Sequence, residues 1–184
     1  MAELACTPGQ TVGPFFARAL PYPGDRQLVS AEHAGAIRLH GTVYDGAGDA
    51  VPDALIELSQ PGPDGLLNHQ TGSLRRDGIT FTGWGRCATD AAGHYSFSTL
   101  TPGTSNGRAG FFALTIFARG LLNRVFTRAY LPDGDLDADR LLRDLDAGRR
   151  KTLICNAETG GYRFDIHLQG ALETVFLTYG GEPG

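Results

Sequence analysis

Histidines are the side chains of this sequence best suited to hold a transition metal, and their spacing argues against a metal site. His40, His94 and His167 each fall in a run that alternates apolar and polar residues, as a half-buried strand does. Two imidazoles on one strand face the same side at positions i and i+2, and none of the three has a second histidine at that spacing. We expect these histidines to be hydrogen-bonded or exposed, and we assign them no metal.

Tyrosine and cysteine could supply anionic metal ligands, but their surroundings favour other roles. Tyr95, Tyr130 and Tyr162 lie in apolar alternating runs, which is typical of core or interface aromatics with a hydrogen-bonded hydroxyl. The three cysteines are far apart in the sequence and form no Cys-x-x-Cys pair: Cys6, Cys87 and Cys155. We predict neither a disulfide framework nor a thiolate metal site.

Residues 7–16 combine features of a loop that docks against another surface. Pro8 and Pro14 lack amide donors, while Gly9 and Gly13 allow close backbone approach. The Phe pair at 15–16 follows directly and could anchor the loop against a core. The alternative is a frayed chain end, which residue types alone do not exclude.

Arg128 is a candidate anion-binding residue because a guanidinium presents a planar fork of donors that fits a carboxylate. It lies in an expected strand, where a structural ion pair or a surface position is an equally good interpretation of the residue alone. The sequence leaves both roles open at this point.

The composition describes an ordinary globular chain. It has 184 residues, 41% of them hydrophobic and 20% charged, and a net charge of −4. These values fit one domain spanning residues 1–184 and lack the basic footprint of a nucleic-acid-binding protein. The first residues show no leader pattern and no stretch is long enough to cross a bilayer, so we expect a cytoplasmic protein.

The elements that must position these side chains are expected to be strands. The 26 glycines and 10 prolines make up about a fifth of the chain, which suits many short strands joined by turns. We predict an all-β fold, an antiparallel β-sandwich of about eight strands with long loops. The expected strands lie near residues 37–45, 54–59, 85–89, 94–100, 110–118, 123–131, 151–155 and 162–168.

Three details of this prediction concern pairing and helix content. Pro52 and Asp53 could join the first two strands as an antiparallel pair, and residues 90–93 could join the next two as a hairpin. The apolar run at 110–118 suggests a strand buried on both faces. One short surface helix is expected at 137–146, where leucines share one face and Gly148 acts as a stop.

The order of several motifs resembles the intradiol ring-cleavage dioxygenases over nearly the whole chain. Any one of these motifs could occur in an unrelated sandwich, but their joint order is specific. They are Thr-Pro-Gly-Gln-Thr-Val-Gly-Pro-Phe at 7–15, Leu-His-Gly-Thr-Val-Tyr-Asp at 39–45, Gly-Arg-Cys-Ala-Thr-Asp at 85–90 leading into Gly-His-Tyr-Ser-Phe at 93–97, Phe-Ala-Arg-Gly at 117–120, Thr-Arg-Ala-Tyr at 127–130, and the run from Tyr162 to Phe176.

The resemblance implies a catechol-opening reaction at an Fe(III) centre held by two tyrosines and two histidines, the histidines alternating on one strand. This sequence departs from that ligand set. Phe111 and Ala113 stand where the histidine pair is expected, and no shift of alignment can place a histidine between His94 and His167. The tyrosine positions correspond to Leu66–Leu67 and to Thr104 or Ser105.

The resemblance therefore implies an iron-free subunit of a two-chain enzyme, with Fe(III) bound by a homologous beta chain in an alpha-beta hetero-oligomer. It implies that the substrate is a catechol, protocatechuate, opened between its hydroxyls by O2 to 3-carboxy-cis,cis-muconate. The residues that would line the pocket opposite the iron are Thr11, Gly13, Pro14 and Arg128. Arg128 would face the ring carboxylate, residues 1–36 would form an N-terminal docking segment, and this chain would supply no catalytic residue and no metal ligand.

Two other functions stay open beside this one. The first is a free-standing β-sandwich module that binds a small ligand or a carbohydrate and has no catalytic activity. The second is a self-sufficient iron dioxygenase, which the phenylalanine and alanine at the histidine positions disfavour.

Overall fold

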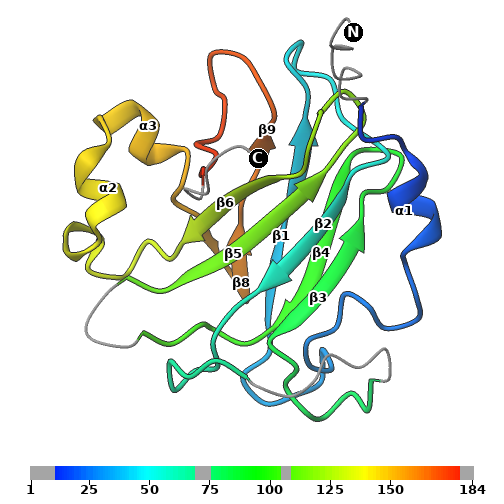
Figure 1. Ribbon diagram of the computed structural model, residues 1–184. Helices are drawn as coiled ribbons and strands as arrows, with labels where there is room; N and C mark the ends of the chain where they lie inside the picture. Colours follow the sequence, from blue (N-terminus) through cyan, green and yellow to red (C-terminus); the bar gives the residue numbers. More distant parts are fainter. Residues whose placement is uncertain (1–10, 69–75, 105–108, 179–184) are drawn as a thin grey trace, which may run out of the picture.

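The computed structural model describes residues 11–68, 76–104 and 109–178. Two sheets pack face to face, and short helices lie at their edges (Figure 1). The strands are β1 (Ile37–Tyr44), β2 (Leu55–Ser59), β3 (Trp84–Ala88), β4 (His94–Thr99), β5 (Phe111–Phe117), β6 (Val125–Tyr130), β7 (Asn156–Glu158), β8 (Gly161–Arg163) and β9 (Ile166–His167). The all-β sandwich predicted from the sequence is confirmed.

The two sheets differ in size and in strand direction. One has the order β4-β1-β8-β7, with β9 also paired to β1, and the other has the order β3-β2-β5-β6. The second sheet is antiparallel throughout, but β8 and β9 run parallel to β1. The sequence predicted antiparallel pairing everywhere. A parallel neighbour requires a long crossover, and here the chain passes through the second sheet and the helices before it returns to β1.

Half of the connections between successive strands cross from one sheet to the other, and two of these crossings correct predicted pairings. The turn at Pro52–Asp53 leads from β1 to β2, but these strands belong to different sheets. β3 and β4 likewise lie in different sheets and do not form a hairpin. Sequence alternation identifies a buried face but not the sheet to which it belongs, so neighbouring strands in sequence were wrongly paired.

The core lies between the inner faces of the two sheets. On β5, Phe112, Leu114 and Ile116 point inward and are buried, while the residues between them are only partly buried. The predicted burial of this strand on both faces is therefore wrong. Each buried side chain of this size contributes about 1.5–3 kcal/mol to folding, and the partly open outer face of β5 is where the candidate site lies.

The helices are more numerous and shorter than predicted. The described residues form α1 (Phe15–Ala19), a 3-10 turn (Leu136–Ala138), α2 (Arg140–Asp144) and α3 (Ala147–Lys151). Asp139 and Asp146 accept hydrogen bonds from amides in the first turns of α2 and α3. The cap at Asp139 separates α2 from the 3-10 turn within the range 137–146, where one helix was expected, and α3 is an additional helix beyond that range.

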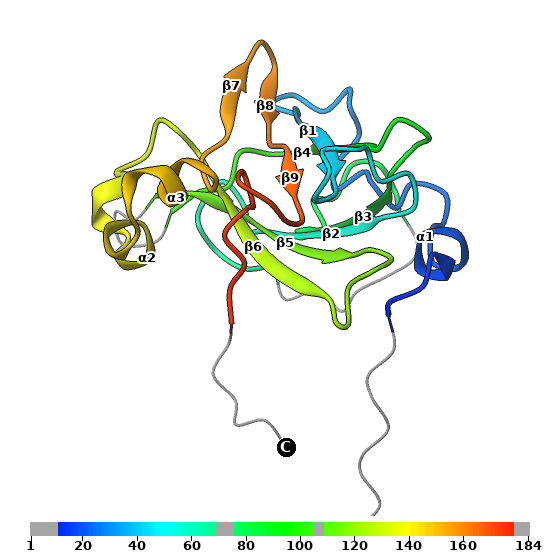
Figure 2. The ribbon, with the colours of Figure 1, turned by 90° about the horizontal axis from the view of Figure 1, so that it is seen from above.

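The predicted strand at residues 151–155 is also wrong. α3 continues to Lys151 through Gly148, which was expected to be a stop, and the only strand-like contact in this segment is a bridge between Ile154 and Tyr130. Figure 2 shows α2 and α3 at one edge of the layers and α1 at the other, with the β7–β8 hairpin projecting from the first sheet. Among the described helices, none has the length and apolar character needed to cross a membrane.

Candidate functional site

The outer face of β5 carries the two positions where the family resemblance places metal-binding histidines. Phe111 and Ala113 alternate with the buried Phe112 and Leu114, so their side chains share the outer side of the sheet. The strand thus has the backbone arrangement that a histidine pair would need, with side chains that have no lone pair to offer.

These two positions line a cavity of about 300 Å³ together with other predicted ligand positions. Leu67 reaches it from the loop after β2, and Thr104 reaches it from the loop after β4. Ser105, the alternative to Thr104, lies outside the described residues. The remaining lining residues are Ser59, Gln60, Pro61, Gly65, Gly103, Ala109 and Gly110. The structure therefore brings together residues from three separate segments at which the family resemblance places metal ligands.

The chemistry of this lining does not fit a ferric ion. Fe(III) is held by anionic oxygens and imidazoles, whereas Leu67, Phe111 and Ala113 present hydrocarbon. The buried Gln60 amide is already engaged, because its Nε2 donates to the Leu100 carbonyl at 2.8 Å and its Oε1 accepts from the Thr99 hydroxyl at 2.6 Å. Elsewhere in the part of the chain that the structure describes, no three His, Cys, Asp or Glu side chains are grouped to bind a metal.

Arg128 lies beside this cavity, and among the described residues its guanidinium contacts the side chains of Phe111, Tyr130 and Asp139. It pairs with Ala113 across the β5–β6 ladder, and its guanidinium carbon lies 4.3 Å from the centroid of the Phe111 ring. Its Nη1 donates to the Tyr130 hydroxyl at 3.0 Å and lies 3.9 Å from a carboxylate oxygen of Asp139. The ion pair that the sequence left open is present, and the Arg128 side chain nevertheless keeps 28% of its surface exposed.

The Tyr130 hydroxyl is a protonated phenol over the physiological range. Burial raises its pKa to about 12, Arg128 partly opposes this rise, and the Asp139 carboxylate adds to it. A protonated hydroxyl can accept from Arg128 while keeping a proton to donate. The neutral Tyr130 hydroxyl can therefore accept a hydrogen bond from the Arg128 guanidinium without adding a negative charge beside it.

The N-terminal segment is anchored at the turn between β5 and β6. The Thr11 hydroxyl accepts from the Gly120 amide at 2.6 Å, and the Val12 amide donates to the Leu121 carbonyl at 2.6 Å. Pro14 stands at the N-cap position of α1, directly after Gly13. The described part of the segment is thus docked on the sheet; residues 7–10 lie outside the described residues.

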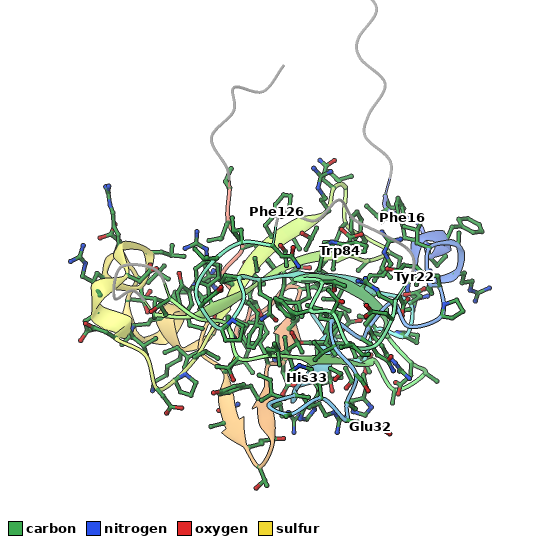
Figure 3. The ribbon with its side chains drawn as sticks, turned by 90° about the horizontal axis from the view of Figure 1, so that it is seen from below. Phe16, Tyr22, Glu32, His33, Trp84 and Phe126 are labelled. Carbon is green, nitrogen blue, oxygen red and sulfur yellow. The ribbon has the colours of Figure 1, made fainter. Side chains whose placement is uncertain are left out.

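The aromatic anchor of this segment is one residue rather than the predicted pair. The Phe16 ring stacks on the Phe117 ring of β5 at 5.1 Å between centroids, whereas Phe15 is 74% exposed. Residue 15 begins α1, so the two side chains point in different directions. Figure 3 shows Phe16 and Phe126 on the side of the molecule opposite His33 and Glu32.

The four predicted pocket residues form two groups in this chain. Thr11, Gly13 and Pro14 are close to the β5–β6 turn, whereas Arg128 lies three ladder pairs beyond the Ile116–Val125 pair that precedes the turn. Both groups flank the outer face of the four-stranded sheet. A surface that packed on this face would meet both.

His40, His167 and Tyr95 make structural contacts. His40 lies 2.8 Å from a Glu158 carboxylate oxygen, and the His167 ring stacks on the Tyr44 ring at 4.9 Å. The buried Tyr95 donates its hydroxyl hydrogen to a backbone carbonyl. Its side chain is a core aromatic with a satisfied hydroxyl.

Sequence reasoning missed the surroundings of Arg128. From the sequence, Tyr130 was expected to be a core or interface aromatic, and neither Phe111 nor Asp139 was connected with Arg128. Arg128 and Tyr130 are two residues apart on one strand, so their shared face could have been inferred from the period of a strand. Asp139 lies outside any strand pattern, and only the fold brings it to this site.

Comparisons with known proteins agree with the fold and with the motifs. The family model described as "Dioxygenase" matches residues 13–123. The protocatechuate 3,4-dioxygenase alpha chain of Burkholderia cepacia is 36% identical, covering 96% of this chain and 99% of its own length. The alpha chain of Pseudomonas putida is 34% identical over 94% of this chain and 96% of its own length. The Burkholderia cepacia beta chain is 31% identical, over 71% of this chain and 63% of its own length.

Solved structures show the same architecture. The dioxygenase domain of a dioxygenase and carbohydrate-binding fusion protein from Streptomyces sp. SirexAA-E superposes with a TM-score of 0.61 and 25% identity, covering 90% of this chain and 99% of that one. An intradiol ring-cleavage dioxygenase from Tetranychus urticae gives 0.59 at 15% identity, over 94% of this chain and 98% of that one, which is a likeness of fold alone. The chain belongs to the intradiol ring-cleavage dioxygenases, a family of non-heme iron enzymes.

Proposed function

We propose that this chain is the iron-free alpha subunit of a protocatechuate 3,4-dioxygenase and completes the pocket in which a homologous beta chain carries out ring cleavage. The observation that carries the proposal is the cavity on the outer face of β5. Positions expected for iron ligands converge there, and the side chains present cannot bind Fe(III). The relationship to alpha chains over nearly the full length of this chain supports the same conclusion.

The proposal assigns this chain a binding role and the partner the redox chemistry. Fe(III), bound by the beta chain, supplies the activation of the catechol toward O2, which gives 3-carboxy-cis,cis-muconate. Arg128 binds the ring carboxylate through charge-assisted hydrogen bonds, which are stronger than neutral ones in a pocket with little water. Thr11, Gly13 and Pro14 form the wall opposite the iron, and residues 1–36 dock on the partner.

Two further points belong to this proposal. A cytoplasmic location, expected from the sequence, fits an enzyme of this kind. A stand-alone module that binds a small ligand or a carbohydrate is the less favoured function, because the alpha-chain relatives match almost the whole chain and the beta chain is itself a relative.

The test is reconstitution with a beta chain from the same source. We expect the purified chain alone to leave protocatechuate unchanged and the co-expressed complex to consume O2 with it. In the complex, Arg128→Ala is expected to raise the KM for protocatechuate about 10- to 100-fold, which corresponds to the loss of a charged hydrogen bond. Unchanged turnover and affinity in both Arg128→Ala and a deletion of residues 1–14 would show that the pocket assignment is wrong.

A further inference from the structure

On the outer face of β5 and β6, three side chains among the described residues contact the guanidinium of Arg128. They are the Phe111 ring, the Tyr130 hydroxyl and the Asp139 carboxylate. An arginine side chain has several rotatable bonds, and a free one adopts many orientations in solution. An arginine that must only provide positive charge needs none of these contacts.

We propose that Phe111 and Tyr130 are positioning residues that fix the guanidinium of Arg128 in one orientation, so that the completed pocket prefers ring ligands bearing a carboxylate. This inference rests on the proposed function and assigns to this chain the selection of the substrate's carboxylate. Phe111 then has a role of its own at a position where the family resemblance places a metal ligand.

The ladder between β5 and β6 builds this arrangement directly. Phe111 pairs with Tyr130 and Ala113 pairs with Arg128, so Arg128 and Tyr130 share one face of β6 next to the Phe111 side chain. The small Ala113 side chain leaves room opposite Arg128, and the aromatic ring two residues away offers a face for the guanidinium. Cations favour such a ring face within about 6 Å of its centroid.

The two positioning residues are themselves fixed. Tyr130 is fully buried, its amide donates to the Leu153 carbonyl, and its carbonyl accepts from the Cys155 amide. The Phe111 ring packs against the Tyr130 ring at 5.3 Å between centroids. A guanidinium held by such neighbours loses little conformational entropy when it binds an anion.

The charged groups around Arg128 are compatible with anion binding. Asp139 is largely buried, and its other carboxylate oxygen accepts from the Leu141 amide at 2.9 Å, so it is committed to capping α2. Arg140 and Arg143 line a neighbouring cavity together with Arg128 and Asp139. Arg140 also pairs with Asp144 at 3.6 Å, so three arginines face two carboxylates and leave one net positive charge, which favours a negatively charged ligand.

The experiment compares two ring ligands on the complex of this chain with a beta chain. The probes are 4-hydroxybenzoate and 4-hydroxybenzamide, which differ in charge and which lack the second hydroxyl of a catechol. Inhibition constants are measured against protocatechuate for the unmodified complex and for Arg128→Ala, Phe111→Leu, Phe111→Tyr and Tyr130→Phe. The readout is the preference for carboxylate over amide.

We expect Arg128→Ala to reduce this preference about 10- to 100-fold. Phe111→Leu and Tyr130→Phe should each reduce it about threefold to tenfold, as expected for one cation–ring contact or one hydrogen bond, with little change for the amide. Phe111→Tyr keeps the ring and should keep the preference. Iron content and subunit stoichiometry should match the unmodified complex.

The outcomes separate the two levels of the proposal. An unchanged preference in Arg128→Ala overturns the substrate role of Arg128 itself. A preference that falls in Arg128→Ala but not in Tyr130→Phe or Phe111→Leu overturns the positioning role and leaves the proposed function standing. Equal weakening of both ligands in Phe111→Leu and Tyr130→Phe would show that these residues are merely structural. If the Phe111→Leu variant does not form a complex with the beta chain, the result for Tyr130→Phe alone tests the positioning role.

Discussion

Two neighbouring regions on the outer face of the four-stranded sheet have opposite chemistry. The cavity lined by Phe111 and Ala113 is mostly apolar, although the family resemblance places metal ligands at several of its positions. Arg128, next to it on β6, keeps a charge, a hydrogen-bond partner and an ion pair. A metal site needs all its donors at once, so it is lost when they are replaced, whereas a single fixed cation can still serve a binding role.

The comparison also shows how one strand serves two purposes. Inward residues of β5 maintain the fold, and outward residues determine what the face can bind. Changes on the outer side leave the core between the sheets intact, although Phe111 also packs against a second buried cluster that includes Tyr130 and Leu142.

The largest loss of stability is expected from removing an inward-facing side chain of β5. Phe112→Ala removes a fully buried ring from the core, and we expect it to lower the free energy of unfolding by about 3–5 kcal/mol. Phe111→Ala, on the outer side, should cost clearly less because its ring is only partly buried. Urea denaturation of the purified chain measures both, and equal losses would contradict the assignment of inner and outer faces.

A smaller effect concerns the phenol beside Arg128 at alkaline pH. Folding raises the pKa of Tyr130 from 10.0 to about 12, so the protonated phenol stabilises the folded state fully below pH 10. This stability is lost as the pH rises from about 10 to 12, by up to about 2–3 kcal/mol. Burial also raises the pKa of Cys155 to about 12, so the comparison must be between the unmodified chain and Tyr130→Phe.

The control for that experiment is the same pair of proteins near neutral pH. The free energies of unfolding should differ there by an amount that does not change with pH, since neither protein then titrates at residue 130. An identical alkaline decline in the two proteins would show that the Tyr130 hydroxyl is not held in its protonated form by the fold.

The geometry of the cation, rather than its charge alone, is tested by Arg128→Lys in the complex. A lysine keeps the charge but loses the planar fork and the contact with the Phe111 ring. We expect the KM for protocatechuate to rise about tenfold, between the unmodified complex and Arg128→Ala. A lysine variant with unchanged KM would show that the guanidinium shape does not matter.

The smallest effect is expected at the N-terminal segment. Thr11→Ala removes the hydrogen bond from the Gly120 amide, which is worth about 1 kcal/mol. Thr11→Ser retains the hydroxyl and is the matched control. We expect the alanine variant to weaken association with the beta chain about fivefold in sedimentation or light-scattering titrations, since the segment is then less well ordered for docking. Equal association of both variants would argue against a docking role.

Much of the architecture followed from the sequence because alternation and turn residues report directly on half-buried strands. β1, β4 and β5 were expected close to their observed bounds. The pairing of strands was not predictable, because the inner faces of two sheets have the same pattern and a connection between sheets resembles a hairpin turn. The start of α2 at Arg140 and the additional helix α3 depend on the caps at Asp139 and Asp146, which a leucine pattern does not reveal.

The candidate site was predictable to a different degree in its two regions. The positions lining the cavity were marked by resemblance, and the fold brings Leu67, Thr104, Phe111 and Ala113 together. The neighbours of Arg128 were not identified, because Asp139 lies in a separate segment and its contact depends on how α2 packs beside β6. The sequence identifies Arg128 as a charged residue, but only the fold shows which side chains contact its guanidinium.

The most direct test of the account is the iron content of this chain by itself, measured together with its visible absorption after purification from iron-rich medium. The account predicts a colourless protein without stoichiometric iron, while the complex with a beta chain contains iron and shows the absorption of an iron–phenolate centre. Stoichiometric ferric iron bound by the isolated chain, with such a visible band, would contradict it.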